Sequence, residues 1–249
     1  APEIAARGHV LALPGLVARV LAESGRTLNQ LDAVAVGAWP GLIGSLLVGV
    51  TAAKVIAARC SIALIAVDHI EAHLGALHLG RPTVAYPLVG LVASGGHSHF
   101  YHASAAGRLT VLGGTIDDAA GEAYDKAGAV LGLRYPGGPH VDRLAAAGNP
   151  ARFALPRSFI NDATLRLSFS GLKTAFLYAM RGPQGKDPLT LDAHGIADAC
   201  ASFQAAVVDV LVAKLLLAAE REGVRTIAVG GGVACNRGLR ALNCEAFIG

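Results

Sequence analysis

The sequence is poor in charge and in cysteine, and both shortages limit what the protein can be. Lys and Arg number 21 and Asp and Glu 18, so the net charge is only +3, and there is no dense Lys/Arg tract. The charge therefore permits a nucleic-acid partner but does not indicate one. The four cysteines (Cys60, Cys200, Cys235 and Cys244) have no C-x-x-C spacing. We expect free, mostly buried thiols and a reducing, cytoplasmic location.

A long uninterrupted apolar run is also missing. The most apolar region, Leu42–Ala58, is interrupted by Lys54 and diluted by glycine, serine and threonine. It falls short of the roughly 18 or more apolar residues of a membrane span, so we expect a buried, alanine-rich helix and no membrane partner. No charged segment leads into an apolar core at the N-terminus, so no signal peptide is expected. With 249 residues, 53% of them hydrophobic, the chain can form one large domain or two lobes around a well-buried core.

Helical and strand patterns alternate along the chain, which makes an α/β fold the default. The patterns predict helices over 1–24, 46–58, 69–79, 115–131, from 168 onward, and 196–222 as one or two segments. They predict strands over 32–36, 62–67, 84–93, around 100–101 and 224–229. The run over 62–67 is expected to be buried. Within 196–222, the residues expected inside are Val207, Val208, Leu211, Leu215 and Leu216.

Two histidines four residues apart, His69 and His73, follow the strand predicted over 62–67. This spacing places both imidazoles on one helix face, where they can reach a single cation. From spacing alone, a metal site and a polar surface are equally good interpretations, and the pair supplies only two ligands. Glu71 lies two residues after His69, so it is poorly placed as the base of an H-E-x-x-H hydrolase. A capping box with Asp68 as N-cap is its simpler role.

Glycine-rich turns end three of the apolar stretches: Trp39–Ser45, Ser94–Ser98 and Gly230–Asn236. The middle turn is predicted to join two strands of a hairpin, and its Gly95 and Gly96 amides would suit a phosphate or carboxylate. An ordinary hairpin is the alternative. His97, in this turn, could meet the histidine pair or a ligand. The last turn has a nucleotide-cradling pattern of strand, glycines and helix, but it is not G-x-G-x-x-G.

An acidic row is predicted on the helix over 115–131, where Asp118, Glu122 and Asp125 share one face and Thr115 pairs with Asp118 in a capping box. The row is either solvated or approached by hydroxyls, amines or positive charge. The turn Tyr135–Pro139 follows and could fold back over this face. Lys173, at the start of a later helix, could meet a phosphate, although solvation is the usual state of such a lysine.

Taken together, several of these stretches resemble the TsaD/glycoprotease family, in the family's order and spacing across nearly the whole chain. The stretches that carry the resemblance are Pro2–Ala5 with His9, Pro40–Gly44, His69–His73, Ser94–His97, Asp117–Lys126, Tyr135–Pro139, Ser168–Thr174 and Gly231–Asn236. The resemblance implies an actin/sugar-kinase-like fold of two lobes with an adenylate site. It implies transfer of a threonylcarbamoyl group from threonylcarbamoyl-AMP to N6 of the adenosine 3′ of the anticodon, in tRNAs that read ANN codons.

The resemblance also assigns residues and partners. It implies that His69 and His73 bind one divalent metal ion, Fe²⁺ or Zn²⁺. It implies an adenylate-binding set made of Ala93, Ser94, Gly95, Gly96, His97, Asp125, Gly138, Asp142 and Asn236. The implied macromolecular partners are tRNA, a paralogous non-catalytic subunit and an ATPase subunit of a bacterial complex.

Two departures from the family pattern shape the remaining expectations. The family's opening strand with its phosphate-type turn and its third metal ligand, an Asp near the C-terminus, have no match here. We therefore expect a chain truncated at both ends, with 1–67 a remnant of the N-terminal lobe and 68–249 a second lobe carrying the metal and adenylate sites. The alternative functions are a metalloendopeptidase acting on glycoproteins and a non-catalytic lobe that only binds partners.

Overall fold

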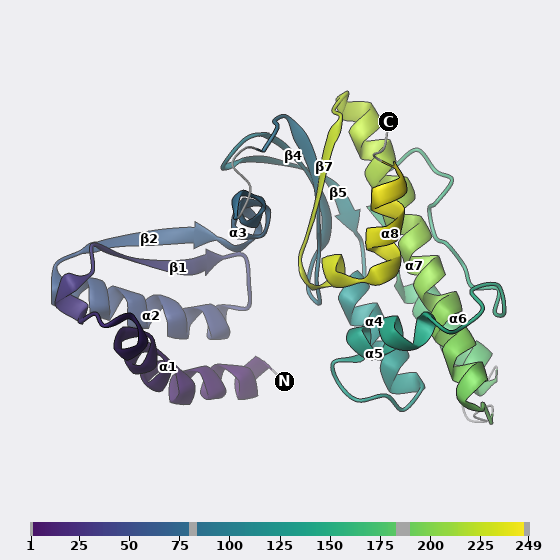
Figure 1. Cartoon of the computed structure of the whole chain (residues 1–249), viewed down its shortest axis with the longest axis horizontal. Coiled ribbons are helices and arrows are strands. Elements are labelled where there is room, and N and C mark those ends of the chain that lie inside the picture. The colour runs from purple at the N-terminus through teal and green to yellow at the C-terminus, as the bar shows by residue number, and fades with distance from the viewer. Residues whose placement is uncertain (1, 80–83, 183–189, 247–249) are drawn as a thin grey trace. The chain divides into compact units, whose positions relative to one another are not determined.

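The computed structural model describes residues 2–79, 84–182 and 190–246, and the chain divides into two compact units, Ala1–His73 and Leu74–Gly249. The first unit is a parallel β-α-β arrangement preceded by a helix (Figure 1). In chain order its elements are α1 (Pro2–Ser24), η1 (Leu28–Gln30), β1 (Ala33–Trp39), α2 (Ile43–Cys60), β2 (Ala63–Asp68) and the first residues of α3 (His69–Gly75). Strands β1 and β2 pair in register from Ala33↔Ala63 to Gly37↔Val67.

In the first unit, the strand over 62–67 and the helix over 46–58 were expected to be buried, and both predictions were wrong. Residues Ala63–Ala66 of β2 are exposed, with Ile65 half exposed, and only Ala53 and Ala57 of α2 are buried. The physical reason is that β1 and β2 form a sheet of only two strands among the described residues, so little surface is available to bury apolar side chains. The alanines of α2 supply its packing stripe, and its larger side chains, Ile43, Leu47 and Val55, face outward.

The second unit is built on a mixed five-stranded sheet in the order β6-β5-β4-β3-β7. Strand β3 is antiparallel to β4 and parallel to β7, and β4 is antiparallel to β5. Its remaining elements are η2 (Ala76–His78), β3 (Leu88–Ala93), β4 (Ser98–Ala105), β5 (Arg108–Thr115), α4 (Ala120–Val130), α5 (Gly137–Ala145), β6 (Arg166–Leu167), α6 (Ser170–Arg181), α7 (Ala193–Glu222), β7 (Thr226–Gly230), η3 (Gly232–Cys235) and α8 (Arg237–Ala246). In Figure 1, α7 runs alongside this sheet.

The core of the second unit lies between α7 and the sheet. Val89, Leu91 and Phe100 from the strands are fully buried with Phe203 and Leu211 of α7. Burial of each such side chain contributes about 1.5–3 kcal/mol, which explains why α7 is a single unbroken helix. The same burial explains why α7 is apolar enough, by length and composition, to cross a membrane. The helix α2, expected to fall short of a membrane span, is 18 residues long and is also apolar enough by these two criteria.

Several predicted boundaries moved. The strand predicted from Val84 begins at Leu88, and Leu216, expected inside, is 38% exposed. The helix predicted from Thr115 begins at Ala120, because Thr115 is the last residue of β5 and its hydroxyl donates to the Asp118 carbonyl in the turn that follows. The sequence also predicts a loop over 181–190, because this stretch is polar and contains proline and glycine, and most of it falls outside the described residues.

A fully buried cation on α7 fixes the segment that leads into β6. The Lys214 Nζ donates to the Asp162 carboxylate at 2.7 Å, to the Asp162 carbonyl at 2.7 Å and to the Thr164 carbonyl at 2.9 Å. Lys214 has 0% side-chain exposure, whereas Asp162 retains 33%. All three ammonium protons therefore have acceptors, and only the carboxylate can gain water if its partner is lost.

We expect Asp162→Ala to lower the thermal midpoint more than Lys214→Met. The first change leaves the buried Lys214 ammonium without its carboxylate partner, whereas the second leaves the Asp162 carboxylate, which water can reach. The hydrogen bond from Lys214 lowers the pKa of Asp162 from 3.8 to about 2. The stabilisation should thus be complete above about pH 5 and be lost as the pH falls through about 2. Thermal melts of both variants between pH 2 and 7 test this. Equal midpoints, or a Lys214→Met protein that keeps this pH dependence, would contradict it.

Candidate functional site

The predicted hairpin between β3 and β4 is present, and its turn is closed by Ser94. The Ser94 amide donates to the His97 carbonyl at 2.7 Å, and the Ser94 hydroxyl oxygen accepts from the His97 amide at 3.1 Å. The Gly121 amide, in the first turn of α4, donates to the Ser94 carbonyl at 3.1 Å. The start of α4 is thereby held against the turn, and Gly95 and Gly96 stay exposed.

Two glycines allow this close approach. A Cβ on Gly121 would lie 2.7 Å from the Ser94 carbonyl carbon. Gly231 has a φ of +88°, and a Cβ there would collide with the Ala93 carbonyl. Only glycine accepts both the positive φ and the contact. The turns after β3 and β7 are consequently brought together with the N-terminus of α4.

Asp125 ties α4 to the start of α5. Its Oδ1 accepts from the Gly137 amide at 2.7 Å and the Gly138 amide at 3.4 Å. A Cβ on Gly137 would lie 2.8 Å from the Tyr124 carbonyl, so the two helices meet backbone to backbone. The turn at 135–139 does fold back over the Asp125 side of α4, as the sequence suggested. A carboxylate at a helix N-terminus is electrostatically favoured there.

Asn236 is 7% exposed and connects three elements. Its Nδ2 donates to the Tyr124 hydroxyl at 3.2 Å and to the Gln204 Oε1 at 2.7 Å, and its Oδ1 accepts from the Leu239 amide at 3.0 Å. Asn236 is thus the N-cap of α8 as well as a link between α4 and α7. Burial, and then the negative charge of Asp142, raise the pKa of Tyr124, so its hydroxyl stays protonated.

Asp142, one turn into α5, faces α8. Its Oδ1 accepts from the Arg237 amide at 2.9 Å, and its Oδ2 lies 3.7 Å from the Arg237 Nε. The first backbone amide of α8 is therefore satisfied by a side chain of α5.

These elements enclose a cavity of about 530 Å³ within the second unit. Its walls come from the β3–β4 turn, α4, α5, η3 and the start of α8. The lining residues are Gly95, Gly121, Tyr124, Asp125, Pro136, Gly138, Pro139, Asp142, Arg143, Gly232, Val233, Cys235, Asn236 and Arg237. A cavity of this size, with apolar walls and a few converging polar groups, suits a nucleotide-sized ligand.

Of the nine residues assigned to the adenylate by resemblance, the cavity brings together Gly95, Asp125, Gly138, Asp142 and Asn236. The other four (Ala93, Ser94, Gly96 and His97) do not line it. Ala93 is buried against Gly231, and Ser94 and His97 close the turn that presents Gly95. The assignment of all nine to a ligand stays a prediction.

In the first unit, Asp68 caps α3 through its Oδ1, which accepts from the Ile70 amide at 2.7 Å and the Glu71 amide at 3.2 Å. The cap starts the helix at His69 and sets the histidines one turn apart. Their Nε2 atoms converge to 3.1 Å. Two nitrogens that share one tetrahedral ion at about 2.0 Å lie about 3.3 Å apart, so the pair fits two neighbouring ligand positions. Among the described residues, no three or more His, Cys, Asp or Glu side chains are grouped so that they could hold a metal ion.

Comparison with known proteins decides the family. Residues 1–248 match the family model of TsaD, tRNA N6-adenosine threonylcarbamoyltransferase. The chain belongs to the TsaD family. It is 49% identical to the tRNA N6-adenosine threonylcarbamoyltransferase of Geobacter metallireducens over 96% of this chain and 69% of that protein. It is 50% identical to the protein of the same name in Geobacter sulfurreducens over 96% of this chain and 68% of that one.

Family membership gives the chain the actin/sugar-kinase-like α/β fold that its motifs implied, and it makes the chain a transferase that acts in tRNA modification. The chain spans 69% and 68% of these two relatives.

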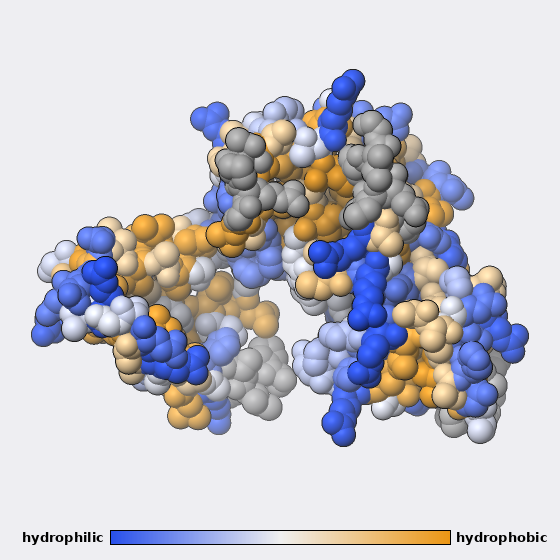
Figure 2. All heavy atoms as spheres, viewed as in Figure 1, coloured by the Kyte–Doolittle hydropathy of each residue, from blue (hydrophilic) through white to orange (hydrophobic). Residues whose placement is uncertain are grey.

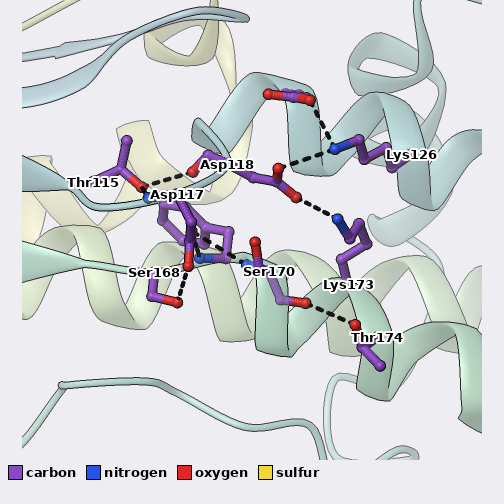
Figure 3. Close-up of polar contacts among 10 residues, drawn as sticks. Thr115, Asp117, Asp118, Lys126, Ser168, Ser170, Lys173 and Thr174 are labelled. Carbon is purple, nitrogen blue, oxygen red and sulfur yellow. Dashed lines mark hydrogen bonds and ion pairs between the residues drawn. The ribbon is translucent and has the colours of Figure 1, made fainter.

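Within this TsaD family member, the acidic row predicted on one helix face does not exist. Asp118 precedes α4, and its carboxylate lies between Lys126 at 3.0 Å and Lys173 at 2.7 Å (Figure 3). Lys126 also pairs with Glu122 at 2.7 Å. Partial burial alone would raise the pKa of Asp118, but hydrogen bonds from Lys173 and Lys126 outweigh it and lower that pKa. Lys173 is thus an ion-pair partner of Asp118, whose carboxylate joins α4 to α6.

Asp117 has a separate role that the sequence did not reveal. Its carboxylate accepts from the Ser168 hydroxyl at 2.5 Å and from the Phe169 and Ser170 amides at 2.9 and 3.3 Å (Figure 3). Asp117 therefore caps α6 from a distance of 51 residues or more in the chain. Asp117 and Asp118 are adjacent in sequence, but Asp117 caps α6 and Asp118 binds two lysines.

Proposed function

We propose that the chain transfers a threonylcarbamoyl group from threonylcarbamoyl-AMP to N6 of the adenosine 3′ of the anticodon, in tRNAs that read ANN codons. The observation that carries this proposal is the cavity of the second unit, in which Asp125, Gly138, Asp142 and Asn236 lie together with Gly95. The name shared by the relatives supports the reaction class. The donor and the tRNA class are the parts proposed here.

The two carboxylates suit the ribose of an adenylate. Asp125 uses Oδ1 for the amides of α5, so its other oxygen can accept a hydrogen bond from a ribose hydroxyl. Asp142 is held by Arg237 in a similar way and is only 15% exposed. Because Asp125 and Asp142 are both fixed before the ligand arrives, little ordering is needed on binding. The exposed amide of Gly95, at the mouth of the hairpin turn, suits a phosphate or carboxylate oxygen.

The reaction requires one bond to form and one to break. The N6 nitrogen of the adenine attacks the carbamoyl carbon, the C–O bond to the phosphate breaks, AMP leaves and N6 loses a proton. Binding the adenylate rigidly raises the rate mainly by positioning the carbamoyl carbon for this attack. The target base must be presented to the site, as other base-modifying enzymes require.

His69 and His73 would hold the divalent ion, Fe²⁺ or Zn²⁺, that the resemblance implies. When bound, such an ion would polarise the carbamoyl carbonyl and neutralise phosphate charge. What the chain itself contributes is the cap at Asp68, which fixes both rings on one helix turn. We further propose a cytoplasmic setting and a complex with a paralogous non-catalytic subunit and an ATPase subunit, as the resemblance implies.

The direct test is a transfer assay with the purified chain, threonylcarbamoyl-AMP and an unmodified tRNA transcript that reads an ANN codon, followed by nucleoside mass spectrometry. We expect threonylcarbamoyladenosine to form. A matched transcript in which the adenosine 3′ of the anticodon is replaced by guanosine should give none. Absence of product from the adenosine transcript, with the partner subunits supplied, would overturn the proposal.

A further inference from the structure

The mouth of the cavity carries positive charge that no step of the proposed chemistry uses. Arg143 and Arg237 line the cavity, and both side chains are exposed, Arg237 to 70%. Arg240 follows Arg237 by three residues on α8, so the two share a helix face. Arg134 lies two residues before the lining residue Pro136, within about 7 Å along the backbone. These four residues, called the rim arginines below, are all exposed.

The acidic groups near the rim are already engaged. Asp125 is turned toward the amides of α5, and Asp142 is paired with Arg237. The Arg143 Nη2 lies 3.2 Å from the His140 Nδ1, and Arg143 has no acidic partner among the described residues. Arg134 and Arg240 have no side-chain hydrogen bond or ion pair with any residue that the structure describes. The rim therefore has a surplus of cations that are free to meet an anion.

An aromatic ring stands among these cations. Tyr135 lies between Arg134 and Pro136 in the chain and is 85% exposed. Among the large hydrophobic side chains of the described residues, Ile43 has the same exposure and the others are less exposed. Exposed arginines beside an exposed aromatic ring are typical of surfaces for single-stranded RNA, where arginines bind phosphates and rings stack on bases. Figure 2 shows strongly hydrophilic side chains gathered over the part of the second unit that includes α8.

We propose that the rim arginines and Tyr135 form the docking surface for the anticodon loop of the tRNA substrate. This inference rests on the proposed function and adds the residues that hold the acceptor. The arginines neutralise phosphates of the loop, and the Tyr135 ring stacks on an unpaired base, which brings the base to be modified to the mouth of the cavity. A surface beside the donor pocket meets the requirement that both substrates reach one site.

The test separates this surface from the nucleotide pocket by using residues that do not line the cavity. The probe is the unmodified tRNA transcript described above, and its affinity is measured by fluorescence anisotropy at several salt concentrations. For Arg134→Glu/Arg240→Glu we expect tRNA binding to weaken about tenfold or more, and the slope of log K against log salt to fall by about 1–2. The affinity for AMP should not change.

Arg225→Glu is the matched control. Arg225 is exposed, has no side-chain partner among the described residues, and precedes β7 at the end of the strand away from the cavity. This variant should bind tRNA like the unchanged chain. Tyr135→Ala should weaken binding about fivefold or more without altering the salt slope, and Tyr135→Phe should retain binding because the ring remains.

Several results would overturn the inference. They are a chain that does not bind tRNA, a rim variant that binds tRNA as well as Arg225→Glu does, and a rim variant that loses only the partner subunits. The last would make the rim a protein interface. Failure of the proposed function is distinguishable, because a chain that binds tRNA through the rim but yields no threonylcarbamoyladenosine would refute the transfer and leave the docking surface standing.

Discussion

Asp125→Asn is expected to weaken AMP binding by about tenfold to a hundredfold and to leave the fold intact. A hydrogen bond to a charged group contributes about 1.5–3 kcal/mol, which corresponds to this range. The amide oxygen of asparagine can still accept from the Gly137 and Gly138 amides, so α5 keeps its anchor. What is lost is the charge that would meet a ribose hydroxyl. Isothermal titration calorimetry with AMP measures the change.

Two further variants separate binding from stability. Asp125→Ala removes the anchor as well, so it should lower both AMP affinity and the thermal midpoint. Asp192→Asn is the matched control, since Asp192 also caps a helix of the second unit, through the Gly195 amide, and does not line the cavity. It should bind AMP normally. If Asp125→Asn binds AMP as tightly as Asp192→Asn does, Asp125 is not a ligand of the nucleotide.

His69→Ala is expected to abolish threonylcarbamoyladenosine in a strain that depends on the gene of this chain for the modification, a decrease of at least a hundredfold. One imidazole cannot hold an ion as two do, and His69 is exposed, so its removal opens no cavity in the core. Nucleoside mass spectrometry of cellular tRNA measures the product. The zinc and iron content of the purified protein should fall in parallel.

The matched control for this experiment is His78→Ala. His78 is also exposed and contacts only the Tyr86 hydroxyl, at 2.9 Å between Nε2 and Oη, among the residues of its unit. We expect that variant to support normal modification. Unchanged product in the His69→Ala strain would show that the histidine pair has no essential metal role, whatever the metal content of the purified protein.

The parts of the fold that depend on local pattern could be predicted from the sequence. The hairpin at Ser94–His97 was predicted because two apolar strands flank glycines. Helical structure over 196–222 was predicted, as one or two segments, because the apolar period continues for many turns, and the structure has a single helix over 193–222. The cap at Asp68 was predicted for a similar reason, since its acceptor and donors lie within three residues. Hydrogen bonds between residues that are close in sequence can therefore be predicted from a short stretch of the chain.

Features that depend on distant contacts could not be predicted. The prediction of an acidic row on one helix face was wrong because Asp118 lies in the turn before α4. Its carboxylate binds Lys173, which is 55 residues away in sequence. Burial of β2 failed because an apolar run shows only that a strand could be covered, and nothing in the run says how many strands the sheet will have. Tyr124 and Arg237 were missed as cavity residues because their partners are 95 to 112 residues apart in sequence. For the site itself, the resemblance supplied residues that spacing alone could not.

Photolabelling of the chain with 8-azido-AMP, followed by mass spectrometric mapping of the labelled peptides, tests most directly whether the cavity binds an adenylate. We expect label on peptides that line the cavity, within 121–143 or 232–237, and loss of that label when excess AMP is present or when Asp125 is changed to Asn. Label confined to peptides outside the cavity, or label within it that excess AMP does not displace, would contradict the claim that the second unit holds the adenylate site.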